Sequence, residues 1–259
     1  MPIDAFIFDV DGTIADTEEA HRVAFNLAFD RHALGWRWAR AEYRELLKVA
    51  GGKERMRSYI DQLPVSEAER GRLRAMVRDV HFDKTRLYSS VVRDGAVPLR
   101  AGVERLLDEA LADGYKLAIA STTSAVNIDA LLQSTLGPRG LDMFTVIACG
   151  DQVARKKPAP DIYHLALGAL DLRPEQAVAF EDSPNGLGAA VAAGLCTVVT
   201  PNFWTEDHDF ADAALVLPHL GGPDLPLPGE PGRLLQSAAW LTCDEVERIA
   251  ARHATAATH

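Results

Sequence analysis

Acidic side chains stand at the ends of two apolar segments of the sequence. Asp9 and Asp11 follow the apolar run at residues 5–8, and Asp182 comes after Glu181 at the end of a similar run at residues 177–180. Crowded carboxylates repel one another, and a divalent cation relieves that repulsion. Carboxylate oxygens suit Mg²⁺, which usually takes one or two of them together with waters and phosphate oxygens. An Asp-x-Asp-Gly sequence is also common as a polar turn, so the interpretation as a metal site depends on what else lies nearby.

Hydroxyl and cationic groups follow two further apolar segments. Ser121 and Thr122 come directly after the run at 116–120, and the basic triplet 155–157 follows the run at 145–148. A cationic side chain can neutralise a phosphoryl oxygen, and a hydroxyl with its backbone N–H can bind another. The residue types do not choose among the three members of the triplet. With the acidic residues, these groups indicate a site for a phosphate ester.

The candidate groups can share one crevice only if the apolar runs are neighbouring strands. Helical segments separate these runs, and such alternation predicts right-handed crossovers and a parallel sheet. The ligand crevice of such a sheet lies beyond the carboxyl ends of its strands. We therefore predict an α/β fold with a Rossmann-like parallel sheet core. The expected strands lie near residues 5–8, 116–120, 145–148, 177–180, 197–199 and 214–217.

A long segment interrupts this alternation directly after the first strand. Residues 17–91 are rich in Arg, Glu and Ala, with apolar residues at helical spacing, which predicts an inserted all-helical cap domain. The catalytic core would then comprise residues 1–16 and 92–217. Residues 218–259 form a C-terminal extension with an irregular loop and a helix over 234–252. The sequence leaves open whether this extension packs on the core or makes another contact.

Composition narrows the classes of protein. The chain has 259 residues, 47% of them hydrophobic and 25% charged, as in soluble globular proteins. A net charge of −10 argues against nucleic-acid binding and would repel anionic substrates unless a metal and local cations offset it. No apolar stretch reaches the roughly 20 residues of a membrane span, and the N-terminus does not resemble a secretory signal. The scattered cysteines at 149, 196 and 243 suggest buried thiols in a reducing cytoplasm, and the acidic surface favours a soluble monomer.

The four strand-end segments together resemble the motifs of the haloacid dehalogenase superfamily of phosphotransferases. They occur in the family's order between the start of the chain and about residue 217, and the insertion at 17–91 corresponds to the family's small helical cap. The matching segments are Asp9-Val10-Asp11-Gly12-Thr13, Ser121, Lys157 in the context Lys-Pro-Ala-Pro-Asp-Ile-Tyr, and Glu181-Asp182-Ser183-Pro184-Asn185-Gly186.

The resemblance implies a role for each catalytic residue. Asp9 would be the nucleophile that attacks phosphorus and forms an aspartyl-phosphate. Asp11 would protonate the leaving oxygen and then act as the base for the attacking water. Ser121, with the adjacent Thr122, and Lys157 would bind the transferring phosphoryl group.

The resemblance also implies a Mg²⁺ cofactor. The Asp9 side chain, the Asp11 backbone carbonyl and Asp182 would hold the ion, and Glu181 would be a further ligand or a partner of the ligands. These assignments suit phosphoryl transfer, because that reaction depends mainly on positioning and charge neutralisation.

Within the superfamily, the sequence is similar to the subgroup that holds beta-phosphoglucomutase, phosphoglycolate phosphatase and the Calvin-cycle phosphatase for xylulose-1,5-bisphosphate. Segments 18–22, 42–47 and 51–55 are most similar to the last type. A bisphosphate needs cations in the cap for its second phosphate, and sugar hydroxyls need further partners. The expected substrate-binding residues are Glu18, His21, Tyr43, Arg44, Gly52, Lys53 and Arg55. The alternatives are solvated helical ion pairs for the arginines and a partly buried position near the hinge for His21.

The predicted function is Mg²⁺-dependent hydrolysis of a small sugar phosphate through phospho-Asp9, with xylulose-1,5-bisphosphate as the favoured substrate. The alternatives are phosphoglycolate or another sugar phosphate, and a mutase that returns the phosphoryl group to the sugar. Thr13 favours a phosphatase, because beta-phosphoglucomutases commonly carry Val at this place in the motif.

Three other classes fit the sequence less well. A phosphonate hydrolase would use a cap lysine such as Lys53 as a Schiff base, but such enzymes usually lack the second acid of the first motif, here Asp11. A dehalogenase lacks the metal-binding acids. A phospho-aspartate receiver module is much shorter and has no cap.

Overall fold

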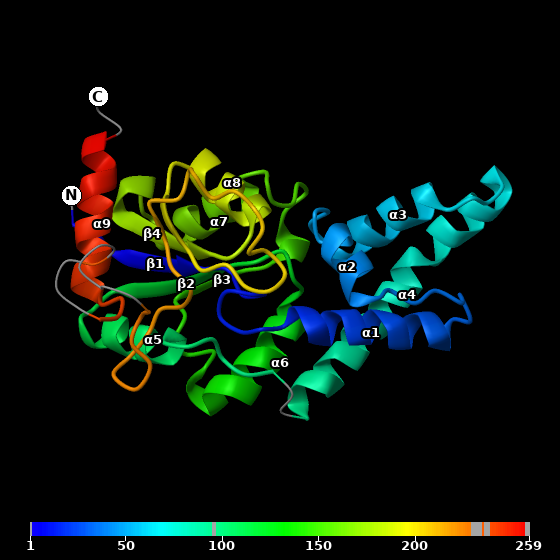
Figure 1. Cartoon of the computed structure of the whole chain (residues 1–259), viewed down its shortest axis with the longest axis horizontal. Coiled ribbons are helices and arrows are strands. Elements are labelled where there is room, and N and C mark those ends of the chain that lie inside the picture. The colour runs from blue at the N-terminus through cyan, green and yellow to red at the C-terminus, as the bar shows by residue number, and fades with distance from the viewer. Residues whose placement is uncertain (1, 95–96, 229–234, 236–238, 257–259) are drawn as a thin grey trace.

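Six parallel strands form one sheet in the larger lobe of the molecule (Figure 1). The computed structural model describes residues 2–94, 97–228, 235 and 239–256. The strand order β3-β2-β1-β4-β5-β6 places β1 at the centre, where Phe8 lies opposite Ile119 on one side and Phe180 on the other. The predicted fold class is therefore confirmed. The strands are β1 (Ala5–Phe8), β2 (Lys116–Ala120), β3 (Val146–Ala148), β4 (Ala177–Glu181), β5 (Cys196–Val199) and β6 (Leu215–Val216).

Helices cover both faces of the sheet, which explains why the strands are continuously apolar. Phe6 and Phe8 of β1 point to the face that α5, α6 and α9 cover, whereas Ala5 and Ile7 point to α7 and α8. The bounds are α5 (Val103–Ala112), α6 (Ala125–Leu136), α7 (Asp161–Leu170), α8 (Pro184–Ala192) and α9 (Cys243–Ala256), with 3₁₀ turns at Gly137–Arg139, Gly150–Gln152 and Pro174–Gln176.

The insertion after β1 is a separate helical unit, which lies to the right of the sheet in Figure 1. It has its own core of buried aromatic and aliphatic side chains, including Phe25, Trp38 and Met56. Its last helix continues into the larger lobe, where Tyr88 and Val92 join the core beside the sheet. The unit comprises α1 (Glu18–Arg31), α2 (Arg40–Leu46), α3 (Gly52–Gln62) and α4 (Glu67–Arg93).

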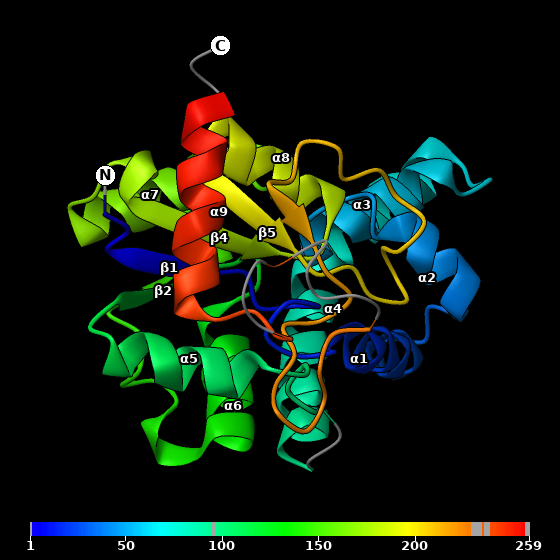
Figure 2. The same ribbon diagram turned by 60° about the vertical axis from the view of Figure 1, so that its left-hand side comes forward.

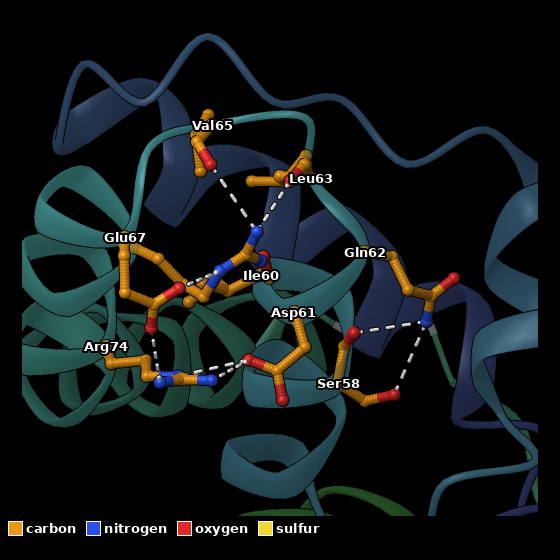
Figure 3. Close-up of polar contacts among 9 residues, drawn as sticks. Ser58, Ile60, Asp61, Gln62, Leu63, Val65, Glu67 and Arg74 are labelled. Atoms are coloured by element: carbon orange, nitrogen blue, oxygen red, sulfur yellow. Dashed lines mark hydrogen bonds and ion pairs between the residues drawn. The ribbon is translucent and has the colours of Figure 1, made fainter.

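Polar contacts fix the turn between α3 and α4 (Figure 3). The Arg70 guanidinium donates to the backbone oxygens of Ile60 at 2.6 Å and Leu63 at 3.1 Å. Arg74 pairs with Asp61 on α3 at 2.7 Å. These bonds satisfy carbonyls at the end of α3, which have no partner within the helix. The two helices are therefore joined at their far end as well as through the apolar core.

The C-terminal extension packs on the core, which the sequence had left open. Helix α9 lies beside β5 and α5 (Figure 2), and Val246 and Ile249 are buried in the core there. The prediction of a helix over 234–252 was wrong at its start, because α9 begins only at Cys243. The Thr242 hydroxyl accepts from the Glu245 N–H at 3.3 Å and caps the helix there. Residue 234 lies outside the described residues.

Two further features of the structure concern the helices and the cysteines. No helix among the described residues is long and apolar enough to cross a membrane. The longest helix, α4, has 27 residues, but charged residues recur along it. The cysteines at 149, 196 and 243 are buried and form no disulfide, as their spacing suggested.

Candidate active site

A pocket of about 350 Å³ lies between the carboxyl ends of the strands and the helical unit. The ends of β1, β2 and β4 form its floor, and residues of α1, α3 and α4 form the opposite wall. It therefore stands where the topology of a parallel sheet predicts a ligand crevice. The predicted site residues that line it are Asp9, Asp11, Glu18, His21, Gly52, Lys53, Arg55, Thr122, Lys157 and Asp182.

Three buried carboxylates meet at the floor of the pocket. Asp9, Glu181 and Asp182 each place one oxygen within 4.8 Å of the others. The Lys157 ammonium donates to Asp9 at 2.7 Å and to Glu181 at 2.6 Å. Burial raises the pKa of Asp9 well above its ordinary value; Lys157 opposes this effect, and Glu181 adds to it. Burial, then the neighbouring Asp9 and Glu181, likewise raise the pKa of Asp182.

This carboxylate cluster fits a divalent cation. Lys157 pairs with two of the three acidic groups, so negative charge is in excess in a buried place. All the donors are oxygens, which suits Mg²⁺. Glu181 Oε2 is buried and has no hydrogen-bond partner, whereas Glu181 Oε1 accepts from Lys157 and from the Tyr163 hydroxyl. Asp9 and Asp182 line the pocket and Glu181 does not, so the first two are the better placed ligands, and Glu181 holds the lysine.

The three residues of the basic triplet 155–157 have different partners in the structure. Only Lys157 of the three reaches the carboxylate cluster. The Lys156 ammonium donates to the backbone oxygens of Gly150 and, at 3.0 Å, Val153. Arg155 pairs with Asp161 at 2.9 Å. The open alternative is therefore resolved by where α7 and the preceding turn direct each side chain.

The Asp11 side chain turns away from the carboxylate cluster and toward the helical unit. Its Oδ1 accepts from the Thr17 hydroxyl at 2.6 Å and lies 2.9 Å from His21 Nε2. Lys84 Nζ lies 2.6 Å from His21 Nδ1. Burial would raise the pKa of Asp11, but His21 and Thr17 outweigh it and hold that pKa at about 2. The Asp11 carboxylate is thus engaged with Thr17 and His21, and a metal contact through its backbone carbonyl stays a prediction of the sequence.

Lys84 is a pocket residue that sequence reasoning missed. It is 4% exposed and lies over the rings of Phe25 and Tyr88. Burial lowers its pKa to about 7, although Asp11 opposes that shift. The sequence could have indicated this residue, because Val80, Lys84 and Tyr88 lie on one face of a helix. A lysine on an apolar helix face is buried only when its charge has a partner.

Replacement of His21 by Asn is expected to raise the pKa of Asp11 toward its ordinary value near 4. A depressed pKa contributes stability that is present above about pH 4 and lost as the pH falls through about 2. We compare the two proteins in chelator. At pH 6 the free energy of unfolding of the His21→Asn variant should therefore be lower than that of the unmodified protein by on the order of 1–2 kcal/mol. Urea unfolding should show this difference shrinking by pH 2.5. An equal difference at both values would contradict this origin, and a carboxyl NMR titration of Asp11 checks the pKa directly.

Three predicted contacts are not found at the pocket. The Ser121 N–H donates to the Ala148 oxygen, and its hydroxyl accepts from the Thr123 N–H, so only Thr122 of this pair lines the cavity. Tyr43 and Arg44 also lie outside the lining. In each case the group is engaged with neighbours on the protein.

Tyr43 and Arg44 support the pocket wall without forming it. Tyr43 is fully buried, where its hydroxyl donates to Glu18 at 2.9 Å and accepts from Arg55 at 3.0 Å. Arg44 lies on another side of α2 and pairs with Asp207 at 2.7 Å. Tyr43 thus supports Glu18 and Arg55, and direct contact of Tyr43 or Arg44 with substrate stays a prediction of the sequence.

Gly12 allows close packing beneath the carboxylates. Its φ of 86° is in the left-handed region, and a Cβ there would overlap Asp182 Oδ2 and lie 2.6 Å from Asn202 Nδ2. Sequence reasoning identified this turn but not Asn202, which is distant in the chain. Other pocket residues that it missed are His81, Asn127, Asn185 and Trp204.

The fold and the site together define a class of protein. A parallel sheet presents buried carboxylates and a lysine at its carboxyl edge, below a helical unit inserted after its first strand. An arrangement of this kind fits an enzyme that uses a cation and acidic side chains on an anionic small molecule.

Comparison with known proteins identifies the family. Residues 3–194 match the haloacid dehalogenase-like hydrolase family, so the chain belongs to that family and is an enzyme of its phosphatase type. Protein CbbY of Rhodobacter capsulatus is 45% identical over 232 residues, 87% of this chain and 100% of the relative. The plasmid-encoded CbbY of Cupriavidus necator is 49% identical over 224 residues, 86% of this chain and 88% of the relative.

A solved structure supports the same subgroup. The crystal structure of a CbbY variant from Rhodobacter sphaeroides in complex with xylulose-(1,5)bisphosphate is 44% identical to this chain. The match has a TM-score of 0.78 and covers 86% of this chain and 98% of that one. The resemblance stated from the sequence motifs is therefore confirmed at the level of the CbbY-like subgroup.

Proposed function

We propose that this enzyme hydrolyses a sugar bisphosphate, xylulose-1,5-bisphosphate, in a Mg²⁺-dependent reaction through phospho-Asp9. The observation that carries this proposal is the charge arrangement of the pocket. Its floor holds the carboxylate cluster and Lys157, and its opposite wall carries Lys53 and Arg55. The xylulose-(1,5)bisphosphate bound to the CbbY relative supports the choice of substrate.

The reaction would take place at the floor of the pocket. An Asp9 oxygen attacks phosphorus, the bond to the sugar oxygen breaks, and Asp11 gives that oxygen a proton. Because the phosphate brings negative charge, its binding would raise the pKa of Asp11 and favour the protonated acid. Water then attacks phospho-Asp9 while Asp11 takes its proton, which releases inorganic phosphate. Asp9 and Asp182 would hold Mg²⁺, which when bound neutralises charge on the transferring phosphoryl group.

The second phosphate would bind at the start of α3. Gly51 precedes this helix with a φ of 88°, and Gly52 begins it, so free backbone N–H groups of the first turn lie at the pocket wall. The N-terminus of a helix favours anions. Arg55 is 8% exposed and is held by the Leu46 oxygen at 3.1 Å. This preorganised arginine and the more exposed Lys53 would complete the anion site.

Phosphate release from a substrate panel tests the proposal. The panel contains xylulose-1,5-bisphosphate, ribulose-1,5-bisphosphate, phosphoglycolate, beta-glucose-1-phosphate and phosphonoacetaldehyde, each with Mg²⁺ and with chelator. We expect chelator-sensitive release from xylulose-1,5-bisphosphate in preference to the others. Preferred release from phosphoglycolate or a hexose phosphate would overturn the substrate assignment. Formation of glucose 6-phosphate in place of release would establish the mutase.

The variant Lys53→Ala is expected to reduce kcat/KM for the bisphosphate by about 10- to 100-fold, because a hydrogen bond to a charged group contributes roughly 1.5–3 kcal/mol. The same variant should change kcat/KM for a monophosphate by less than about threefold. Lys53 is partly exposed and pairs with Asp151 at 3.6 Å, so its removal should leave the fold intact.

The matched control is Arg57→Ala, which removes a positive charge from the same helix. Arg57 pairs with Glu54 at 3.9 Å and does not line the pocket. It should behave as the unmodified enzyme on both substrates. Equal losses for bisphosphate and monophosphate in Lys53→Ala would refute the assignment of the second phosphate.

The cap and core boundaries, the cytoplasmic location and the monomeric state stay predictions of the sequence.

A further inference from the structure

The side chain of Asn202 holds one of the buried carboxylates. Its Nδ2 donates to Asp182 Oδ2 at 2.7 Å and to the Gly12 oxygen at 3.3 Å. The overlap that a Cβ at Gly12 would cause shows how closely these groups pack. Asn202 comes from the segment after β5, so it reaches the carboxylate cluster from outside the four sequence motifs.

The same segment enters the core of the helical unit two residues later. Trp204 is 6% exposed and belongs to the apolar cluster of the helical unit, with its ring 5.7 Å from that of Tyr43 at an angle of 88°. The Arg40 guanidinium lies 4.7 Å from the ring centre of Phe203 and 5.3 Å from that of Trp204. We call residues 202–207 the bridging loop, because it contacts both the carboxylate cluster and the helical unit.

Hydrogen bonds within the bridging loop connect Asn202 with Trp204 and Thr205. Asn202 Oδ1 accepts from the Trp204 N–H at 2.8 Å, so a single amide group faces Asp182 with its nitrogen and Trp204 with its oxygen. The Asn202 N–H donates to the Thr205 hydroxyl at 3.1 Å, and the Asn202 oxygen accepts from the Thr205 N–H at 2.9 Å. A shift of Trp204 would therefore rotate the amide that orients Asp182.

We propose that Asn202 is a positioning residue for Asp182, and that docking of Trp204 in the helical unit sets the affinity of the carboxylate cluster for Mg²⁺. This inference rests on the metal site of the proposed function. The bridging loop would make the cation site complete only when the helical unit is seated over the pocket. Residues that orient metal ligands typically change metal affinity by 10- to 100-fold when they are replaced.

Calorimetric titration of each variant with Mg²⁺, without substrate, tests the inference. We expect Asn202→Ala to weaken Mg²⁺ binding about tenfold or more. Trp204→Ala should weaken it about three- to tenfold, although its ring lies among apolar residues of the helical unit. Trp204→Phe keeps an aromatic ring in the cluster and should stay within about twofold of the unmodified enzyme. Circular dichroism confirms that each variant is folded, and Trp204→Leu replaces Trp204→Ala should the latter not fold.

Ile60→Ala is the matched control for loss of packing. Ile60 is fully buried in the same apolar cluster but lies on α3, and it lines neither the pocket nor the bridging loop. Its replacement should lower the stability and leave the Mg²⁺ affinity unchanged.

The outcomes separate this inference from the proposed reaction. Unchanged Mg²⁺ affinity in Asn202→Ala or in Trp204→Ala would overturn the inference, as would an equal loss in Ile60→Ala. Absence of Mg²⁺ binding by the unmodified enzyme would overturn both the inference and the proposed metal dependence. Normal Mg²⁺ binding without phosphate release from any substrate would overturn the proposed reaction alone.

Discussion

Asp9→Asn is expected to reduce phosphate release by at least about 10³-fold while the protein stays folded. The amide cannot attack phosphorus as the carboxylate would, but it retains an oxygen that can accept from Lys157. Asp9, Glu181 and Asp182 repel one another in a buried place, and this repulsion adds to the effect of burial in raising the pKa of Asp9. Removing one of the three charges should therefore leave the melting temperature in chelator unchanged or higher.

The measurements are phosphate release from xylulose-1,5-bisphosphate and thermal unfolding in chelator. Asp16→Asn is the matched control, since Asp16 is an acid close to β1 that is exposed and does not line the pocket. It should retain the activity of the unmodified enzyme. More than about a tenth of the activity in Asp9→Asn would show that Asp9 is not the nucleophile. Loss of folding would show that its charge is needed for stability.

Lys157→Met is expected to lower both the free energy of unfolding and kcat. Lys157 is 5% exposed and is the ammonium that offsets Asp9 and Glu181. Removal of one partner of a buried ion pair costs about 3–5 kcal/mol, because the remaining charge is left without compensation. Loss of a charge that stabilises the transferring phosphoryl group should lower kcat by about 100-fold or more.

The pH dependence has a definite sign. Burial would lower the pKa of Lys157, but Asp9 and Glu181 outweigh it and raise that pKa above the ordinary value. A raised lysine pKa contributes stability that is complete below the unfolded pKa near 10.4 and is lost as the pH rises through the higher folded pKa. The full contribution is thus present at pH 7, where urea unfolding should be compared.

Added Mg²⁺ should restore part of the stability of Lys157→Met, because a divalent cation also offsets the buried carboxylates. Lys156→Met is the matched control for stability. Its ammonium donates only to backbone oxygens among the contacts described, so we expect a loss of about 1 kcal/mol. Similar losses in the two variants would contradict the central place of Lys157 in the carboxylate cluster.

The sequence by itself determined the order and kind of the elements that build the site. Buried parallel strands are continuous apolar runs, and the polar residues directly after each run must meet at one edge of the sheet. This reasoning predicted Asp9, Asp182 and a cation of the triplet 155–157 at one place, and the structure shows Lys157 there with the two acids. It also predicted the helical insertion, since helical spacing of apolar residues is a local pattern.

Only the tertiary structure decided where individual side chains point. The choice of Lys157 over its basic neighbours depends on Asp9, which is far away in the sequence. The turn of Asp11 depends on where the start of α1 places Thr17 and His21. The start of α9 depended on a single cap at Thr242, which periodicity does not indicate.

The bridging loop shows the same limit most clearly. Asn202 and Trp204 carry no motif, yet one contacts Asp182 and the other enters a core built from residues 25–80. Local patterns in a sequence determine which segments become strands and helices. The contacts between distant segments are determined by packing, and they decide which functional groups meet.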